Sequence, residues 1–188
     1  MANVDRPNGF RPVKTISGAP LTGIVRSVGV ADAADIFIGD ALQLASGLAQ
    51  RLAVEGVVLG VAVGFGKKDS MSQEAGGPFN PDDLMTRYYD DSASTNTDWV
   101  VYYVPAEDAI FEAQTNAAVT LVVGEAQDIV VGSGNTTTGI SDMEIDYTNT
   151  TNDGDVVVVE IPSIVGNDPT LANGRYHVKF VNTQFNNV

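Results

Sequence analysis

The sequence contains no cysteine and has little positive charge. Without cysteine, neither a disulfide nor a thiolate metal site can form. A chain of 188 residues needs no such cross-link, because a domain of this size buries about 70% of the surface that its unfolded chain exposes. Ten lysine and arginine residues stand against 24 acidic residues, a net charge of −14. A phosphate backbone repels such a surface, so we expect no direct binding of nucleic acid.

Long apolar runs are also missing. The most hydrophobic stretch, residues 56–66, is bounded by Arg51 and Glu55 on one side and by Lys67 on the other. A membrane helix needs about 20 predominantly apolar residues, so we expect no membrane span. The segment after Met1 is interrupted by charged and turn-forming residues, and we therefore expect no secretory signal.

Histidine is nearly absent, and this limits catalysis. The only one, His177, lies on the polar face of an expected strand with no orienting partner, so we interpret it as a solvated or interface residue. Asp142, Glu144 and Asp146 share one face of another expected strand and could offer oxygen ligands to calcium. Such ligands diverge by about 7 Å along a strand, which favours a solvated acidic face. We predict no catalytic residue, no cofactor and no metal site.

The stretch that is most informative runs from Gly56 to Gly66. With a period of two, its bulky side chains lie on one side and its small residues on the other. We expect a central strand whose small residues pack closely against another backbone or a neighbouring chain. These close-packing residues are Gly60, Ala62 and Gly64.

Short strands separated by turn signals follow one another along the chain. We expect further strands at 24–30, 36–44, 48–54, 99–104, 109–114, 119–123, 128–131, 140–147, 156–161 and 175–181. A helix over 41–54 is the competing interpretation, which Gly47 disfavours. The Asp153-Gly154 turn suggests a hairpin between residues 140–147 and 156–161. The sequence therefore predicts an all-β fold, an antiparallel barrel or sandwich, with at most one or two short helices such as a turn over 80–88.

The first 22 residues differ from the rest. Pro7, Pro12 and Pro20 favour an extended arm, and residues up to 26 carry four basic side chains against one acidic. The remainder carries six basic and 23 acidic residues. We predict an arm over 1–22 that orders on another protein, and a β-rich domain over 23–188 with sub-modules 23–131 (a barrel) and 132–188. The expected contacts of the arm are the apolar anchor Phe10 and the bases Arg6, Arg11 and Lys14.

Several segments together resemble the capsid decoration, or cement, proteins of tailed bacteriophages, particularly marine ones. The opening residues 1–13 look like the start of such virion proteins, and the segments 38–41 and 56–64 resemble their barrel core. Residues 103–108, 110–114 and 138–141 are also similar to that group.

This resemblance implies a structural protein without enzymatic residues. It would be made in the bacterial cytoplasm and bind the outer surface of the virion, often as a homotrimer, holding neighbouring subunits of the major capsid protein together. A second hypothesis is a receptor- or glycan-binding module of a phage fibre or tail that uses the aromatic residues between Tyr88 and Tyr103. A glycan hydrolase with paired carboxylates is third, because no pair can be assigned to a cleft.

Overall fold

A computed structural model describes residues 3–31, 33–53, 56–67, 87–93, 99–147 and 154–185. These residues form antiparallel β-sheets with two short 3-10 helices, η1 (Leu21–Gly23) and η2 (Asp91–Ala93), which confirms the predicted all-β class. The strands are β1 (Arg11–Thr15), β2 (Arg26–Gly29), β3 (Ile36–Phe37), β4 (Ala41–Ala45), β5 (Leu48–Arg51), β6 (Gly60–Lys67), β7 (Tyr88–Tyr89), β8 (Trp99–Pro105), β9 (Ala109–Gln114), β10 (Ala126–Val130), β11 (Glu144–Asp146), β12 (Val156–Glu160) and β13 (Arg175–Phe180).

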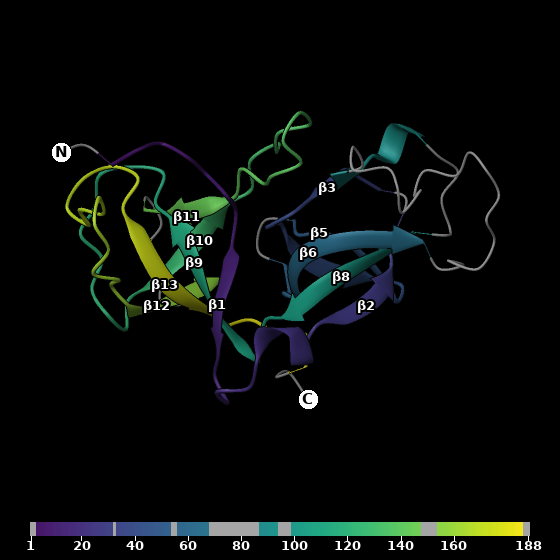
Figure 1. Ribbon diagram of the computed structural model, residues 1–188, viewed down its shortest axis with the longest axis horizontal. Helices are drawn as coiled ribbons and strands as arrows, with labels where there is room; N and C mark the ends of the chain where they lie inside the picture. The colour runs from purple at the N-terminus through teal and green to yellow at the C-terminus, as the bar shows by residue number, and fades with distance from the viewer. Residues whose placement is uncertain are drawn as a thin grey trace.

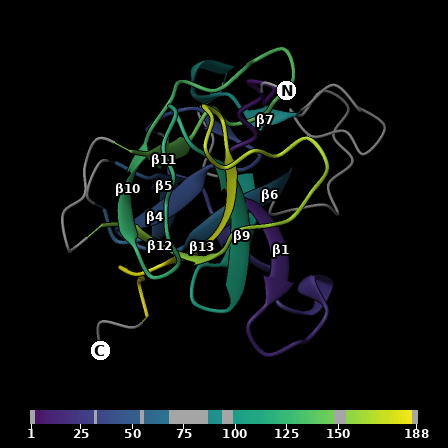
Figure 2. The same cartoon turned by 90° about the vertical axis from the view of Figure 1, so that its left-hand side faces the viewer.

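Two curled sheets lie side by side in Figure 1, and in Figure 2 the six-stranded sheet lies in front of the five-stranded one. The six-stranded sheet has the order β1-β9-β13-β12-β10-β11, and the five-stranded sheet has the order β2-β8-β6-β4-β5. Isolated bridges join Thr115 to Ile145 in the first and Val30 to Ala49 in the second, so each sheet curves back on itself. The pair β3-β7 forms a small third sheet.

Two hydrophobic clusters fill this architecture. The larger one joins the inner face of the six-stranded sheet to Ala41, Val61 and Val104 of the five-stranded sheet. The smaller one lies on the opposite side of the five-stranded sheet and includes Trp99 and Tyr103. Because the five-stranded sheet is covered on both faces, its strands contain apolar residues at successive positions.

The sheets divide the chain differently from the predicted sub-modules 23–131 and 132–188. Strands β9 and β10 lie before residue 131 but belong to the six-stranded sheet, so the chain changes sheet between β8 and β9.

The predicted hairpin between 140–147 and 156–161 is also wrong, because β11 and β12 flank β10 on opposite sides. The expected strand at 119–123 lies outside regular structure. Of the expected helical turn over 80–88, residues 80–86 lie outside the described residues and Tyr88 belongs to β7.

The predicted arm is extended, but it is part of the chain's own fold. Strand β1 pairs with β9 at the edge of the six-stranded sheet. Phe10 just before it is 0% exposed and packs on Phe180 with ring centroids 4.9 Å apart. Its N–H donates to the Gly39 carbonyl at 2.8 Å. The side chain of Phe10 is therefore a core residue and is not available as an anchor for another protein.

Strand β6 follows the predicted alternation only in its first half. A register shift between Ala62 and Gly64 against β8 inserts one extra residue. Val61 therefore lies in the larger cluster while Phe65 joins Ala62 in the smaller one. A β-carbon added to Gly60 would overlap the Val104 carbonyl, whereas the nearest atom to one at Gly64 is a Tyr102 ring carbon at 3.8 Å. The predicted close packing therefore holds at Gly60 and at Ala62, which is fully buried, whereas Gly64 has room for a β-carbon.

This difference between two glycines of one strand can be tested directly. We expect Gly60→Ala to lower the free energy of unfolding by about 1–3 kcal/mol, because the new methyl group must displace backbone. Gly64→Ala should leave it unchanged or raise it by about 0.5 kcal/mol, since alanine restricts the unfolded chain. Urea unfolding of both variants measures this, and equal losses would show that close packing does not set the difference.

A buried ion pair lies next to Gly39, where the N-terminal segment contacts the five-stranded half of the molecule. Asp40 is 0% exposed, accepts a hydrogen bond from the Phe37 N–H at 2.8 Å, and lies 3.1 Å from Nε of Arg51. Burial raises the pKa of Asp40, while Arg51 and hydrogen bonds from Ser141 and Phe37 act in the opposite direction. Arg51 also donates to the Gly132 carbonyl, so the pair connects the five-stranded sheet to the segment after β10.

In the described part of the chain, no helix has the length and apolar character needed to cross a membrane.

Candidate docking surface

Polar side chains fix the N-terminal segment across the outer face of the six-stranded sheet. Gln114 of β9, only 4% exposed, accepts a hydrogen bond from the Arg6 N–H at 3.2 Å. Its amide donates to Asp5 at 3.1 Å and to Glu144 at 2.6 Å. Burial raises the pKa of Glu144, and Asp5 and Asp142 raise it further, while the Gln114 bond lowers it. The backbone that carries Arg6 is thus held in place.

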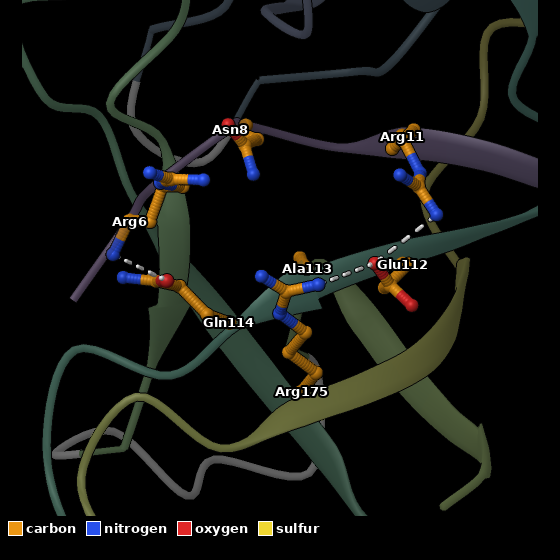
Figure 3. Close-up of a pocket in the computed structure, with 8 residues that line it drawn as sticks. Arg6, Asn8, Arg11, Glu112, Ala113, Gln114 and Arg175 are labelled. Carbon is orange, nitrogen blue, oxygen red and sulfur yellow. Dashed lines mark hydrogen bonds and ion pairs between the residues drawn. The ribbon is translucent and has the colours of Figure 1, made fainter. Parts of the chain in front are cut away.

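Two arginines, Arg11 and Arg175, reach one carboxylate beside this segment, and a third, Arg6, lies over Gln114 (Figure 3). Glu112 of β9 is 8% exposed, and its Oε1 lies 3.5 Å from Nη2 of Arg11 and 3.5 Å from Nη1 of Arg175. Arg6 and Arg175 line the same shallow hollow above Gln114, and Arg6 forms no ion pair with any described residue. Glu112, which pairs with Arg11 and Arg175, lines this hollow, while Asp5 and Glu144 accept hydrogen bonds from the Gln114 amide beside it.

The charges continue across the outer face of the sheet as a ladder. His177 of β13 has one ring nitrogen 3.8 Å from Glu112 and the other 3.1 Å from Glu160. Lys14 lies 2.7 Å from Glu160, and together with His177 it holds the pKa of Glu160 below its usual value. Because each acid is shared among several basic side chains, these contacts orient the side chains on four adjacent strands more than they stabilise the fold.

A second, larger hollow adjoins the arginines at the end of the sheet. It has a volume of about 330 Å³, and its walls include the exposed side chains of Val4, Ile164 and Val165. Arg6 and Arg175 line it as well, so the two hollows share a wall of guanidinium groups. We call the two hollows together the arginine-valine surface; it comprises Arg6, Arg11, Arg175, Val4, Ile164 and Val165.

The structure brings together only some of the predicted contact residues. Arg6 and Arg11 meet on this surface, while Lys14 lies further along the ladder and Phe10 is in the core. The predicted close-packing residues belong to the other sheet. Sequence reasoning missed Arg175, which is 164 positions from Arg11. The only available signal was its place on the polar face of the last strand.

Several of the carboxylates and aromatic residues that the sequence singled out have structural partners. Glu144 accepts from Gln114, and Asp146 accepts from Asn116 at 3.3 Å. Among the described residues, no three acidic or histidine side chains lie as a group that could hold a metal ion. Tyr89 and Tyr103 are buried in the smaller cluster, and Tyr88 stacks on Phe37.

Comparison of the chain with protein-family models, with curated proteins and with solved structures gave no match.

Proposed function

We propose that the chain is a structural virion protein that binds the outer surface of a tailed-phage capsid and strengthens contacts between major capsid protein subunits. The observation that carries the proposal is the arginine-valine surface, where Arg6, which has no ion pair with a described residue, adjoins exposed apolar side chains on a chain with a net charge of −14. A charge so placed orients an acidic partner and favours one docking geometry. The segment resemblance described above supports the choice of a capsid as the partner.

Assembly is part of the same proposal. A homotrimer would present three such surfaces to neighbouring capsid subunits. Linking several weak contacts raises the overall affinity by about 10²–10⁴ over that of a single contact. The protein would be made in the host cytoplasm and found on the virion exterior.

The test is binding to purified heads that lack the protein. We expect the double variant Arg6→Gln/Arg11→Gln to bind at least about tenfold more weakly, because each lost charge pair at an interface is worth about 1 kcal/mol or more. Arg175 stays in place and keeps Glu112 paired. The matched control is Arg26→Gln/Arg87→Gln, which changes the net charge equally at two exposed arginines that line neither hollow. Binding by the first variant at the level of the control would contradict the proposal.

Copy number separates this role from that of a fibre or tail module. A protein that covers the head is present in hundreds of copies per particle, whereas a fibre module is present in few. Densitometry of virion proteins measures this. The aromatic residues on which the fibre hypothesis depended are largely buried, with Tyr102 the exposed exception, so no observation favours it.

A further inference from the structure

We propose that strands β1, β9 and β13 form a mechanical clamp, which resists tension applied between the N-terminal segment (residues 3–10) and the residues that follow β13. Both β1 and β13 are antiparallel to β9, so they run parallel to each other on either side of it. Figure 2 shows the three strands side by side. The clamp concerns tension within the chain and does not depend on which protein the arginine-valine surface binds.

The two points at which tension would enter lie at opposite ends of these strands. The Arg6 N–H donates at 3.2 Å to Gln114, the last residue of β9, so the N-terminal segment arrives at that end. The Val181 N–H donates at 2.9 Å to the carbonyl of Asp155, which precedes β12, so the chain leaves β13 at the other end. A pull between the two segments therefore acts along the strands and drives β1 and β13 in opposite directions.

The direction of the pull decides how the backbone hydrogen bonds share the force. In an antiparallel pair these bonds lie perpendicular to the strands. A pull along the strands therefore loads all the bonds of a pair at the same time, whereas a pull that peels off an edge strand breaks them one after another. Forced unfolding is governed by the unfolding rate, and a step that breaks many bonds at once has a higher barrier.

Charged side chains connect the same strands on the outer face of the sheet. Oε1 of Glu112 in β9 lies 3.5 Å from Arg11 of β1 and 3.5 Å from Arg175 of β13. Its Oε2 lies 3.8 Å from His177 of β13. Each contact contributes little to the stability of the resting fold. Sliding of β1 or β13 along β9 would, however, separate several of them together.

Aromatic rings connect the strands on the inner face. Phe10, just before β1, packs on Phe180 of β13 with ring centroids 4.9 Å apart, and Phe111 of β9 packs on Phe180 at 5.3 Å. All three side chains are buried. Because the interior is closely packed, β1 cannot slide along β9 without removing Phe10 from this cluster. The three strands are thus connected on both faces of the sheet.

The first experiment pulls single molecules of the full-length protein in two directions. The chain has no cysteine, so introduced cysteines define where DNA handles attach. Val4→Cys/Val181→Cys, at two exposed positions, loads the clamp along its strands. Val4→Cys/Ala118→Cys attaches both handles at the Gln114 end and peels β1 from the edge of the sheet. We expect the first pair to unfold at a severalfold higher force in optical tweezers at the same pulling speed. Equal forces, or a lower force for the first pair, would overturn the inference.

Two matched substitutions test the connections on the outer face. Glu112→Gln removes the carboxylate that joins β1 to β13, whereas Glu107→Gln removes one that lies 3.9 Å from Arg26, outside the three strands. In the Val4→Cys/Val181→Cys protein, the first should lower the unfolding force and the second should not. Urea unfolding of both variants corrects for any change in overall stability. An equal loss of force after this correction would contradict the clamp. Head binding tests the capsid role separately, so either proposal can fail without the other.

Discussion

Replacing Phe10 by alanine is expected to lower the free energy of unfolding by about 3–5 kcal/mol. The side chain is fully buried, packs on Phe180, and belongs to the cluster shared by both sheets. Truncating a buried phenylalanine loses its transfer free energy and leaves a cavity. Because domains are stable by only about 5–15 kcal/mol, the variant should unfold at a much lower urea concentration.

The control for this prediction lies on the same N-terminal segment. Ile16 is 51% exposed, so Ile16→Ala should change the stability by less than about 0.5 kcal/mol. If residues 3–15 instead formed an arm that detaches from the domain, both substitutions would leave the unfolding midpoint unchanged. Similar midpoints for Phe10→Ala and wild type would therefore contradict the packing described here.

The second large effect is expected at the buried pair of Asp40 and Arg51. Arg51→Met should cost about 3–5 kcal/mol at neutral pH, because it leaves the Asp40 carboxylate buried without its counter-charge. The change also removes the cation-π contact with Phe37 and the bond to the Gly132 carbonyl. Urea unfolding at pH 7 measures the loss.

The loss should depend on pH in a defined direction. Burial already raises the pKa of Asp40, and removing Arg51 takes away a contribution that lowers it. An acid whose pKa is higher in the folded than in the unfolded state destabilises the fold above the folded pKa, and the penalty disappears as the pH falls towards the unfolded value. The difference between Arg51→Met and wild type should therefore narrow as the pH falls from 7 towards 4.

Two further variants identify the cause. Adding Asp40→Asn to Arg51→Met should recover part of the lost stability, since the unpaired charge is gone. Arg26→Met removes a half-exposed arginine from Glu107 and Asp108, which lie 3.9 Å and 3.4 Å away, and should cost less than about 1 kcal/mol. A loss of the same size for Arg26→Met, or one independent of pH for Arg51→Met, would show that burial of Asp40 is not responsible.

The sequence predicted only some of the residues of the candidate surface. Arg6 and Arg11 stood out because a basic segment precedes an acidic body. Glu112 and Arg175 did not, because their importance arises from the pairing of β1, β9 and β13. Local patterns indicate which face of a strand is polar, but contacts across β-strands far apart in sequence depend on the strand order, which periodicity does not determine.

The sequence by itself determined the fold class and most strand positions, because alternating apolar residues and turn-forming glycines act locally. Only the tertiary structure decided where the chain changes sheet, that β10 separates β11 from β12, and that residues 10–15 belong to the domain. The same holds for Gly56 to Gly66. There a bulge places Phe65 on the opposite face from Val61, and it leaves Gly60 closely packed but Gly64 with room for a β-carbon. Such features depend on what packs against each strand. The physical reason is that each strand is buried by segments far from it in the sequence, and a local pattern of residues does not show which segments these are.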